Sequence, residues 1–246
     1  MPPIRKGDGT PVTPKGISQI RTGDGRILFD GVAIPDTLVD QWPHDDGSGT
    51  TLSNQLTDAD GAINGASWTA LENAVGGQYL EYDGDENNTS LGDDPVNYIY
   101  NGDYTFTTFI RPDSTSGRNT IWAQDNGITV RFEDGTSDLR IIHAGIANEQ
   151  VNVSFSQGEW HFFCMSYNSQ QSEYDITVQE VGQTEQTDTV SIDMTSEPTD
   201  TELLFAADPE DLGERNYQGG KDETTFSDSI LTDEDKDQLK ERRDEF

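Results

Sequence analysis

The sequence predicts an all-β fold, a two-sheet antiparallel jelly-roll sandwich with an extended N-terminal arm and a short C-terminal helix. Three observations predict it. From about residue 40, short segments rich in aromatic and β-branched residues alternate with clusters of Gly, Asp, Asn and Ser that favour turns. Such frequent turns are typical of a sandwich or barrel and not of βαβ units. The charge balance also changes near residue 36, and residues 232–246 begin with a helix start signal.

Residues 1–36 are predicted to form a separate arm. They hold five basic and four acidic residues, whereas the whole chain has 15 Lys+Arg against 47 Asp+Glu, a net charge of −32. The arm contains two similar turns, RKGDG and RTGDG. Its apolar residues are too few to make a core. A hairpin about Gly23–Gly25 can form, but a two-stranded hairpin is marginal on its own in water. We therefore expect the arm to serve in anchoring or oligomerisation, with the symmetry left open.

The body, residues 37–246, is predicted to hold the strands of the sandwich. They are YLEYDG (79–84), YTFTTFI (104–110), TIWAQ (120–124), ITVRFE (128–133), LRIIHA (139–144), GEWHFFCMSYN (158–168), YDITVQEV (174–181) and ELLFAA (202–207). Residues two apart share a face of a strand, so Trp160, Phe162 and Cys164 are expected to face the core, opposite His161. A reactive cysteine needs a base within hydrogen-bond reach. Cys164 is therefore interpreted as a small buried apolar residue.

A short helix is predicted over residues 232–246. Thr232, with Asp235 three residues later, gives a weak capping-box pattern, and Lys240 and Arg243 lie toward the end, where the helix dipole favours positive charge. Few apolar residues occur in this segment. We expect a solvated helix that lies on the sandwich, or else a contact element for a neighbouring molecule.

The composition excludes several classes of function. A net charge of −32 excludes non-specific nucleic-acid binding through phosphates and disfavours docking on anionic lipid. No apolar run suits a membrane span, and the start MPPIRKGDGTPV lacks the apolar core of a secretory signal. One cysteine allows no internal disulfide. Because aromatic residues make up 9% of the chain, disorder is disfavoured, and the excess of carboxylates predicts a halophilic origin, where salt screens self-repulsion.

Several segments occur in an order that resembles a known family. They are QWPHDDGSGTTLSN, DGAINGASWT, GGQYLEYDGDENN, YTFTTFIRPD, GEWHFFCMSYN with YDITVQEVG, and LLFAADPEDLGERNYQGGKDETTFSDSILTDEDKDQL. Over about residues 40–243 the chain resembles laminin G-like, concanavalin A-like lectin/glucanase domains. Phe109 and Lys221 depart from the family pattern, which has a tryptophan and an apolar residue at these positions. The resemblance implies a jelly roll, commonly with bound calcium and a carbohydrate or protein ligand, on a fold that hosts both binders and enzymes.

Acidic turns supply the candidate calcium ligands. Asp83, Asp85 and Glu86 offer hard oxygens within one turn, as calcium requires. Asp222 is a second candidate through its place in the motif of the resembled family. A solvated acidic turn, without a metal ion, is the alternative interpretation of each cluster.

A carboxylate pair raises the question of catalysis. In EYDGDE, Glu81 and Glu86 have the Glu-x-Asp-x-x-Glu spacing that some glucanases of this fold use for a nucleophile and an acid. Such a pair requires a continuous strand, whereas Gly84 and Asp85 begin a turn. We therefore assign no catalytic residue and predict that the protein is not an enzyme.

Together these features predict a non-catalytic adhesion or glycan-binding module of a virion surface appendage, such as a fibre, spike or turret. The virus would infect halophilic archaea, and the module would recognise the host cell surface. The predicted partners are other virion proteins through residues 1–36, copies of the chain in a homo-oligomer, and a host glycan or glycoprotein, with no nucleic acid and no membrane insertion. The predicted location is the virion surface, with the cell surface of a halophile as the alternative. A purely structural virion or surface-layer component is the second hypothesis, and a glycan hydrolase is the third.

Overall fold

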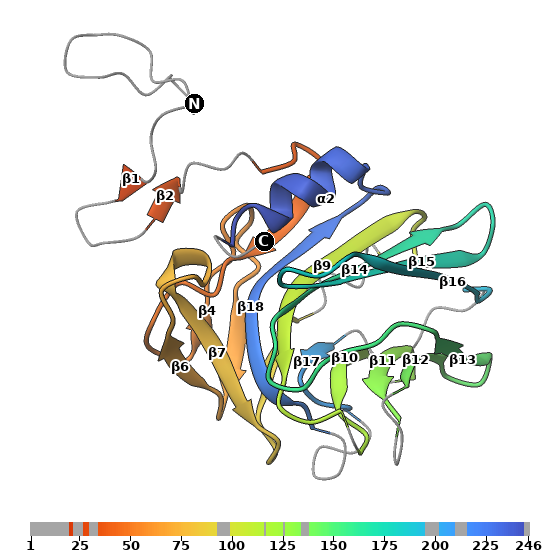
Figure 1. Cartoon of the computed structure of the whole chain (residues 1–246), viewed down its shortest axis with the longest axis horizontal. Coiled ribbons are helices and arrows are strands. Elements are labelled where there is room, and N and C mark those ends of the chain that lie inside the picture. Colours follow the sequence, from red (N-terminus) through yellow and green to blue (C-terminus); the bar gives the residue numbers. More distant parts are fainter. Residues whose placement is uncertain are drawn as a thin grey trace, which may run out of the picture.

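Two antiparallel β-sheets face each other in the computed structural model (Figure 1), as the sequence predicts. The structure describes residues 20–21, 27–29, 34–92, 99–115, 117–124, 126–133, 138–194, 202–209 and 216–243. Each strand segment predicted from the sequence is present as a strand, within a few residues at its ends.

Eight strands of the described chain form one sheet, which we call the back sheet. In spatial order they are β16 (Gln186–Ser191), β15 (Glu173–Glu180), β14 (His161–Asn168), β9 (Tyr104–Pro112), β18 (Gln218–Ser227), β7 (Gln78–Asp83) and β6 (Ser67–Ala70), with β3 (Leu38–Trp42) paired to β18. The long central strands β9, β14 and β18 are buried at nearly every residue and not at alternate ones. Since side chains alternate between faces, both faces of the back sheet are covered.

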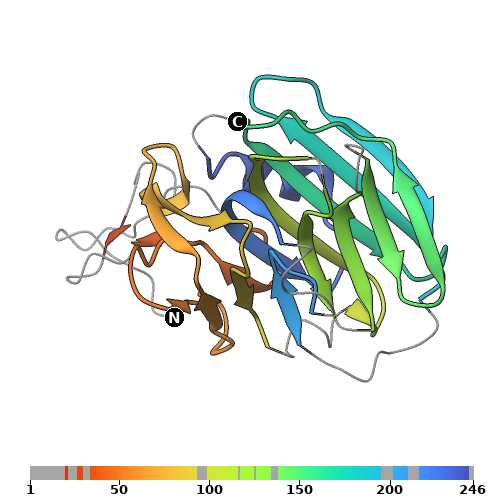
Figure 2. The ribbon, with the colours of Figure 1, turned by 90° about the horizontal axis from the view of Figure 1, so that it is seen from below.

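The other eight strands of the described sandwich form the front sheet. In spatial order they are β13 (Ala147–Val151), β12 (Leu139–His143), β11 (Ile128–Phe132), β10 (Thr120–Gln124), β17 (Leu203–Phe205), β8 (Asn88–Ser90), β5 (Gly61–Asn64) and β4 (Thr51–Leu52). Burial alternates along β12, so its outer side chains are partly open to solvent. Figure 2 views the molecule from below, where the green strands of the front sheet lie side by side.

The main core lies between the two sheets and is rich in aromatic rings. The ring of Phe106 lies 5.5 Å from that of Trp122, 5.9 Å from Phe205 and 5.1 Å from Phe226, measured between centroids. These four side chains come from both sheets and are fully buried. Large aromatic residues dominate core energetics because each removes an extensive apolar surface from water.

A second, smaller core lies on the outer face of the back sheet. Trp160, Phe162 and Cys164 belong to it and pack with Leu239. The prediction that these three residues face the main core is therefore wrong. The residues of β14 that face the main core are Phe163, Met165 and Tyr167. Both faces of β14 are apolar because other segments cover the outer one, and alternation cannot tell which face is inner. The prediction that Cys164 and His161 lie on opposite faces is confirmed, because His161 packs beside the main-core ring of Phe155.

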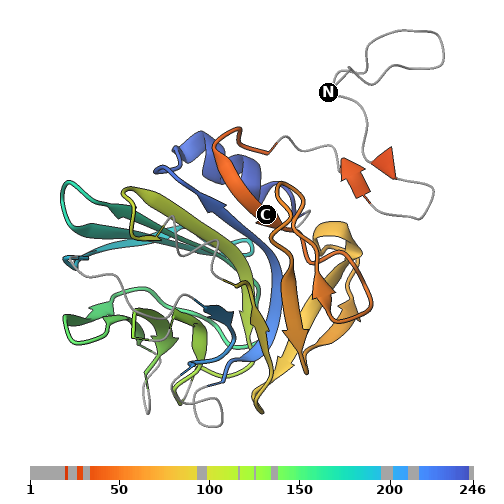
Figure 3. The same ribbon diagram turned by 180° about the vertical axis from the view of Figure 1, so that it is seen from behind.

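The C-terminal helix α2 (Asp233–Lys240) lies over this outer face (Figures 1 and 3). Val75 of the short 3₁₀ helix η1 (Val75–Gly77) packs in the same small core. The predicted capping box is confirmed: the Thr232 hydroxyl accepts from the Asp235 backbone N–H, and Asp235 accepts from the Thr232 N–H. The helix ends earlier than the predicted range, and residues 244–246 lie outside the described residues. Within the described chain, no helix has the length and hydropathy needed to cross a membrane.

The arm contributes two short strands to the described residues. Strand β1 (Ile20–Arg21) pairs in antiparallel orientation with β2 (Ile27–Phe29), which is the hairpin that the sequence predicts. Most of the remaining predicted arm, residues 1–36, lies outside the described residues.

Candidate ligand-binding site

Three strands of the front sheet place a row of side chains on its outer face. Ile128, Val130 and Phe132 of β11 point into the main core, so Thr129 and Arg131 between them point outward. The pairing register continues this face across the sheet. Thr129 lies opposite Ile142 of β12, and Ile142 lies opposite Asn148 of β13.

Two turns form the rim of this surface. Asn126 and Gly127 precede β11, and Ala144 and Gly145 connect β12 to β13. Asn126 has a φ of 55°, and Gly145 has a φ of 73°, a left-handed conformation that Asn and Gly tolerate better than other residues. The Ala144 backbone N–H donates to the Gly127 carbonyl at 3.0 Å, and this bond joins the two turns.

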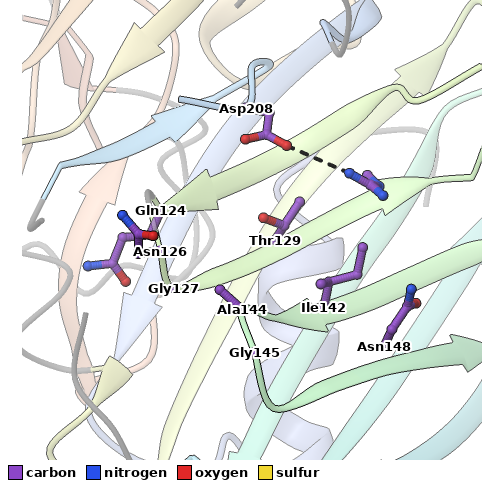
Figure 4. Close-up of a pocket in the computed structure, with 10 residues that line it drawn as sticks. Gln124, Asn126, Gly127, Thr129, Ile142, Ala144, Gly145, Asn148 and Asp208 are labelled. Carbon is purple, nitrogen blue, oxygen red and sulfur yellow. Dashed lines mark ion pairs between the residues drawn. The ribbon is translucent and has the colours of Figure 1, made fainter. Parts of the chain in front are cut away.

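A cavity of about 330 Å³ opens between the rim and the outer face of the front sheet (Figure 4). Most of its lining is polar, with carboxamides, a hydroxyl, a carboxylate and a guanidinium. The lining residues are Gln124, Asn126, Gly127, Thr129, Arg131, Ile142, Ala144, Gly145, Asn148 and Asp208. We call this cavity the front-sheet pocket.

Charged groups at the edge of the front-sheet pocket are held by ion pairs. The Arg131 guanidinium lies 3.7 Å from the carboxylate of Asp208, which follows β17, and the two side chains are 10% and 5% exposed. Glu133 lies 3.5 Å from the same guanidinium. The Arg131–Asp208 pair therefore connects β11 to the segment after β17, and it fixes the position of both charges beside the cavity.

This arrangement suits a polyhydroxyl ligand. Carboxamides and hydroxyls both donate and accept hydrogen bonds, so they can match the hydroxyl groups of a sugar. Hydrolysis of a glycoside generally uses two carboxyl groups that flank the bond to be cleaved. Among the described lining residues Asp208 is the one carboxylate, and it pairs with Arg131.

The first predicted calcium cluster lies away from the front-sheet pocket, at the end of β7. One carboxylate oxygen of Asp83 accepts from the Asp85 backbone N–H at 2.9 Å and from the Asn87 side-chain amide at 2.6 Å. Glu86 has a φ of 57° within the same turn. Within the described residues, no group of three or more His, Cys, Asp and Glu side chains is arranged to hold a metal ion. Calcium at Asp83, Asp85 and Glu86 stays a prediction.

Asp222, the second predicted ligand, lies in a different place, beneath the C-terminal helix. Its carboxylate accepts from the backbone N–H groups of Val75 and Glu223, at 2.9 and 2.8 Å, and from the Arg243 guanidinium at 3.1 Å. Burial raises the pKa of this carboxyl to about 8, against the opposing effects of Arg243 and the N–H donors. A calcium ion at Asp222 would have to compete with these protein donors, and this site too stays a prediction.

The carboxylate pair considered for catalysis is not assembled in the front-sheet pocket. Glu81 lies on β7 of the back sheet and accepts two hydrogen bonds from Arg111, at 2.9 and 2.8 Å. The Arg111 guanidinium also lies over the rings of Tyr79 and Trp160, at 5.3 and 5.6 Å from their centroids. Partial burial raises the pKa of Glu81. These contacts give Glu81 a part in holding Arg111 against the back sheet.

Sequence reasoning did not find the front-sheet pocket. The available signals were the alternation of LRIIH, which turns Arg140 and Ile142 outward, and the turn residues Asn126–Gly127 and Gly145. These signals show which residues point outward. They do not show that Asp208, more than sixty residues away in the sequence, joins them, because that depends on the pairing of β17 with β10.

The fold and the order of its strands define a concanavalin A-like sandwich. Residues 83–235 match the family model described as the concanavalin A-like lectin/glucanases superfamily, and the chain belongs to this superfamily. The predicted resemblance is thereby confirmed at the level of the superfamily. A comparison with curated proteins gives no match.

Solved structures with a similar fold include both enzymes and binding domains. Trypanosoma rangeli sialidase in complex with sialic acid aligns with a TM-score of 0.58 and 11% identity, over 92% of this chain and 35% of the sialidase. The receptor-binding domain of botulinum neurotoxin mosaic serotype C/D aligns with a TM-score of 0.59 and 12% identity, over 85% of this chain and 51% of that domain. The chain thus spans about a third to a half of these proteins. At such identities the likeness concerns the fold alone.

Proposed function

We propose that the protein is a non-catalytic glycan-binding module and that the front-sheet pocket is its binding site. The observation that carries this proposal is the pocket itself, a cavity of about 330 Å³ with a mostly polar lining. Side chains from four strands (β10 to β13), two turns and the segment after β17 converge on it, and an ion pair fixes one edge. Small-molecule sites are concave and have precisely placed polar groups. Membership of a superfamily of lectins and glucanases agrees with a carbohydrate ligand.

A binding role, without catalysis, is supported by the state of the carboxylates. Glu81 is held by two hydrogen bonds from Arg111, and Asp208 is paired with Arg131. A glycosidase nucleophile and acid must approach the scissile bond from both sides. The described pocket offers a single carboxylate for that purpose, so ligand retention is the function that its chemistry favours.

We further propose that the module works in high salt, on a virion appendage that recognises the surface of a host cell. The composition supports the high-salt part of this proposal. With 47 Asp+Glu against 15 Lys+Arg, the folded chain repels itself unless salt screens its charge. The nearly neutral arm, residues 1–36, would attach the acidic body to other virion proteins or to copies of the chain.

A glycan array probed in molar salt tests the binding proposal. We expect the wild-type protein to bind a subset of glycans and Asn148→Ala to bind the same glycans at least tenfold more weakly. Asn148 is exposed, so the substitution removes a ligand contact with little effect on folding. Gln170→Ala is the matched control, because Gln170 is an exposed amide in the turn between β14 and β15, outside the pocket.

Two results would contradict the proposal. Equal loss of binding in Asn148→Ala and Gln170→Ala would show that the effect is not local to the pocket. Absence of binding to every glycan would favour the alternative of a purely structural component of the virion or surface layer.

A further inference from the structure

Two arginines lie next to each other on the outer face of the front sheet. Arg131 of β11 is directly opposite Arg140 of β12 in the antiparallel register, and Gln150 of β13 is opposite Arg140. Directly opposite residues in antiparallel strands have Cβ atoms about 4.5–5.5 Å apart, and like charges at such positions destabilise the sheet. The pair therefore needs anionic groups nearby.

The two arginines differ in how this need is met. Arg131 has carboxylates of Glu133 and Asp208 beside it, at 3.5 and 3.7 Å. Arg140 is partly buried, and within the described residues no carboxylate lies within 4 Å of its guanidinium. Its Nε atom is buried and has no hydrogen-bond partner among the residues that the structure describes. In a chain with 47 acidic residues, a partly buried arginine without an ion pair to any described carboxylate is unexpected.

Arg140 also lies beside the front-sheet pocket. Arg131, which is opposite Arg140 on the neighbouring strand, lines the pocket. Ile142 also lines it, and it lies on the same face of β12 as Arg140 because the two are two residues apart. A ligand in the pocket can therefore extend along the outer face toward Arg140 without crossing the sheet.

We propose that the front-sheet pocket binds an acidic glycan and that Arg140 receives the oxyanion of the sugar, a carboxylate or a sulfate ester. This inference rests on the proposed glycan-binding function and names the class of ligand. Arginine presents several N–H donors in a planar fork, which matches an oxyanion in two-point contact. Bound there, the anion would supply a charge partner for Arg140 and would relieve its repulsion with Arg131. The pocket carboxamides would contact the sugar hydroxyls.

The negative charge of the whole chain does not prevent such binding in high salt. In molar salt the screening length falls to about 3 Å, so distant carboxylates have little effect on the ligand. Partly buried contact pairs are screened much less. The local arginine then outweighs the net charge of −32.

Titration calorimetry in molar salt, at fixed ionic strength, tests the inference. Two probes are acidic: tetragalacturonate, and a tetrasaccharide of otherwise neutral sugars that carries sulfate esters. The other two are the neutral, carboxyl-reduced form of tetragalacturonate and inorganic sulfate. We expect the wild-type protein to bind at least one acidic tetrasaccharide at least tenfold more tightly than the neutral form, and inorganic sulfate far more weakly. Arg140→Gln should abolish this preference and leave the affinity for the neutral form within about twofold. Lys236→Gln on α2 is the control, because it changes the net charge equally and lies on the side of the back sheet.

The outcomes separate this inference from the proposed function. If the wild-type protein binds the neutral form as tightly as the acidic ones, or if Arg140→Gln keeps the preference for acid, the inference is wrong and the glycan site stands. Tight binding of inorganic sulfate alone would show a simple anion site and would overturn the assignment to a sugar. If no oligosaccharide binds, both the inference and the proposed function fail.

Discussion

Lys221 is the fourth residue of β18 and extends between the two sheets, with its side chain fully buried. Its ammonium group donates to the carbonyl of Ile121 on β10 and lies 4.6 and 5.3 Å from the ring centroids of Phe205 and Tyr217. It thus connects the back sheet to the front sheet through one hydrogen bond and two aromatic contacts. Burial lowers the pKa of this lysine well below its ordinary value, because an ammonium ion loses its hydration there.

The substitution Lys221→Met tests the cost of this buried charge. Methionine is flexible and apolar and can fill a similar space, so we expect Lys221→Met to be at least as stable as the wild type at pH 7. The difference should shrink as the pH rises. The unfolded chain, with a lysine pKa near 10.4, binds the proton that the folded chain has lost, so wild-type stability rises with pH between the two pKa values, by up to about 1.4 kcal/mol per unit.

Urea unfolding of both proteins from pH 6 to pH 10, at constant molar salt, measures this effect. Subtracting the two curves isolates Lys221 from the other titrating groups. A difference that does not change with pH would show that Lys221 keeps an ordinary pKa, and the account of its burial would be wrong.

For single residues, the sequence shows that Lys221 departs from the family pattern, but it does not show what surrounds its side chain. The family resemblance places an apolar residue there, so a lysine at that position predicts either burial of a charge or a change of local structure. The rings of Phe205 and Tyr217 and the Ile121 carbonyl come from other parts of the chain. Their convergence depends on sheet pairing, which local patterns do not specify.

At the scale of elements, two ion pairs join β18 to the residues that directly follow the C-terminal helix. Arg243 meets Asp222 at 3.1 Å with both side chains fully buried, and Arg242 meets Glu223 at 2.6 Å. The two carboxylates are consecutive in sequence, and a β-bulge explains how both can reach the two arginines. Asp222 pairs with Phe109 and Thr224 pairs with Thr108, so Glu223 is the extra residue of the bulge.

Removing one partner of the buried pair should therefore be costly. At pH 9, above the pKa of about 8 that burial gives Asp222, we expect Arg243→Met to lower the free energy of unfolding by about 3–5 kcal/mol, because the buried carboxylate loses its counter-ion. Adding Asp222→Asn should recover much of that loss. Urea unfolding of the two single variants and the double variant measures the coupling. A cost below about 1 kcal/mol for Arg243→Met would mean that the pair does not hold the helix in place.

The turn after β7 carries the calcium prediction. If Asp83, Asp85 and Glu86 bind calcium, added calcium should raise the melting temperature by mass action, and Asp83→Asn should remove the increase. Ionic strength must be held constant, because sodium at molar concentration competes for a weak site. If neither Asp83→Asn nor Asp222→Asn changes the calcium response, these residues are not ligands.

The elements differ in how far the sequence predicts them. Strand β14 is apolar on both faces, so the sequence predicts the strand correctly, although it assigns the wrong face to the main core. Strand β18 begins QGGKDE, which has no apolar alternation, and its place at the centre of the back sheet depends on partners β9, β7 and β3. Gly220 illustrates the reason: a Cβ there would lie 2.8 Å from the Trp160 ring, so the residue is chosen by packing and not by local propensity.

At the scale of the whole molecule, charge separates the arm from the body. We predict that deleting residues 1–33, which keeps the hydrogen bond from the Leu38 N–H to the Pro35 carbonyl, leaves a folded monomer in molar salt. The full chain should be oligomeric under the same conditions, because the apolar residues of the hairpin need cover from another chain. Light scattering compares the two. If the truncated chain keeps the oligomeric state of the full chain, the sandwich or α2 carries the assembly instead.

The central claim is that the front-sheet pocket holds a glycan. The most direct measurement is hydrogen–deuterium exchange of the full chain in molar salt, with and without the oligosaccharide that binds most strongly on the array. We predict slower exchange in residues 126–131 and 142–148, around the rim and outer strands of the pocket, and unchanged exchange in α2 on the opposite side of the sandwich. Protection confined to other surfaces, with none in these two segments, would contradict the claim.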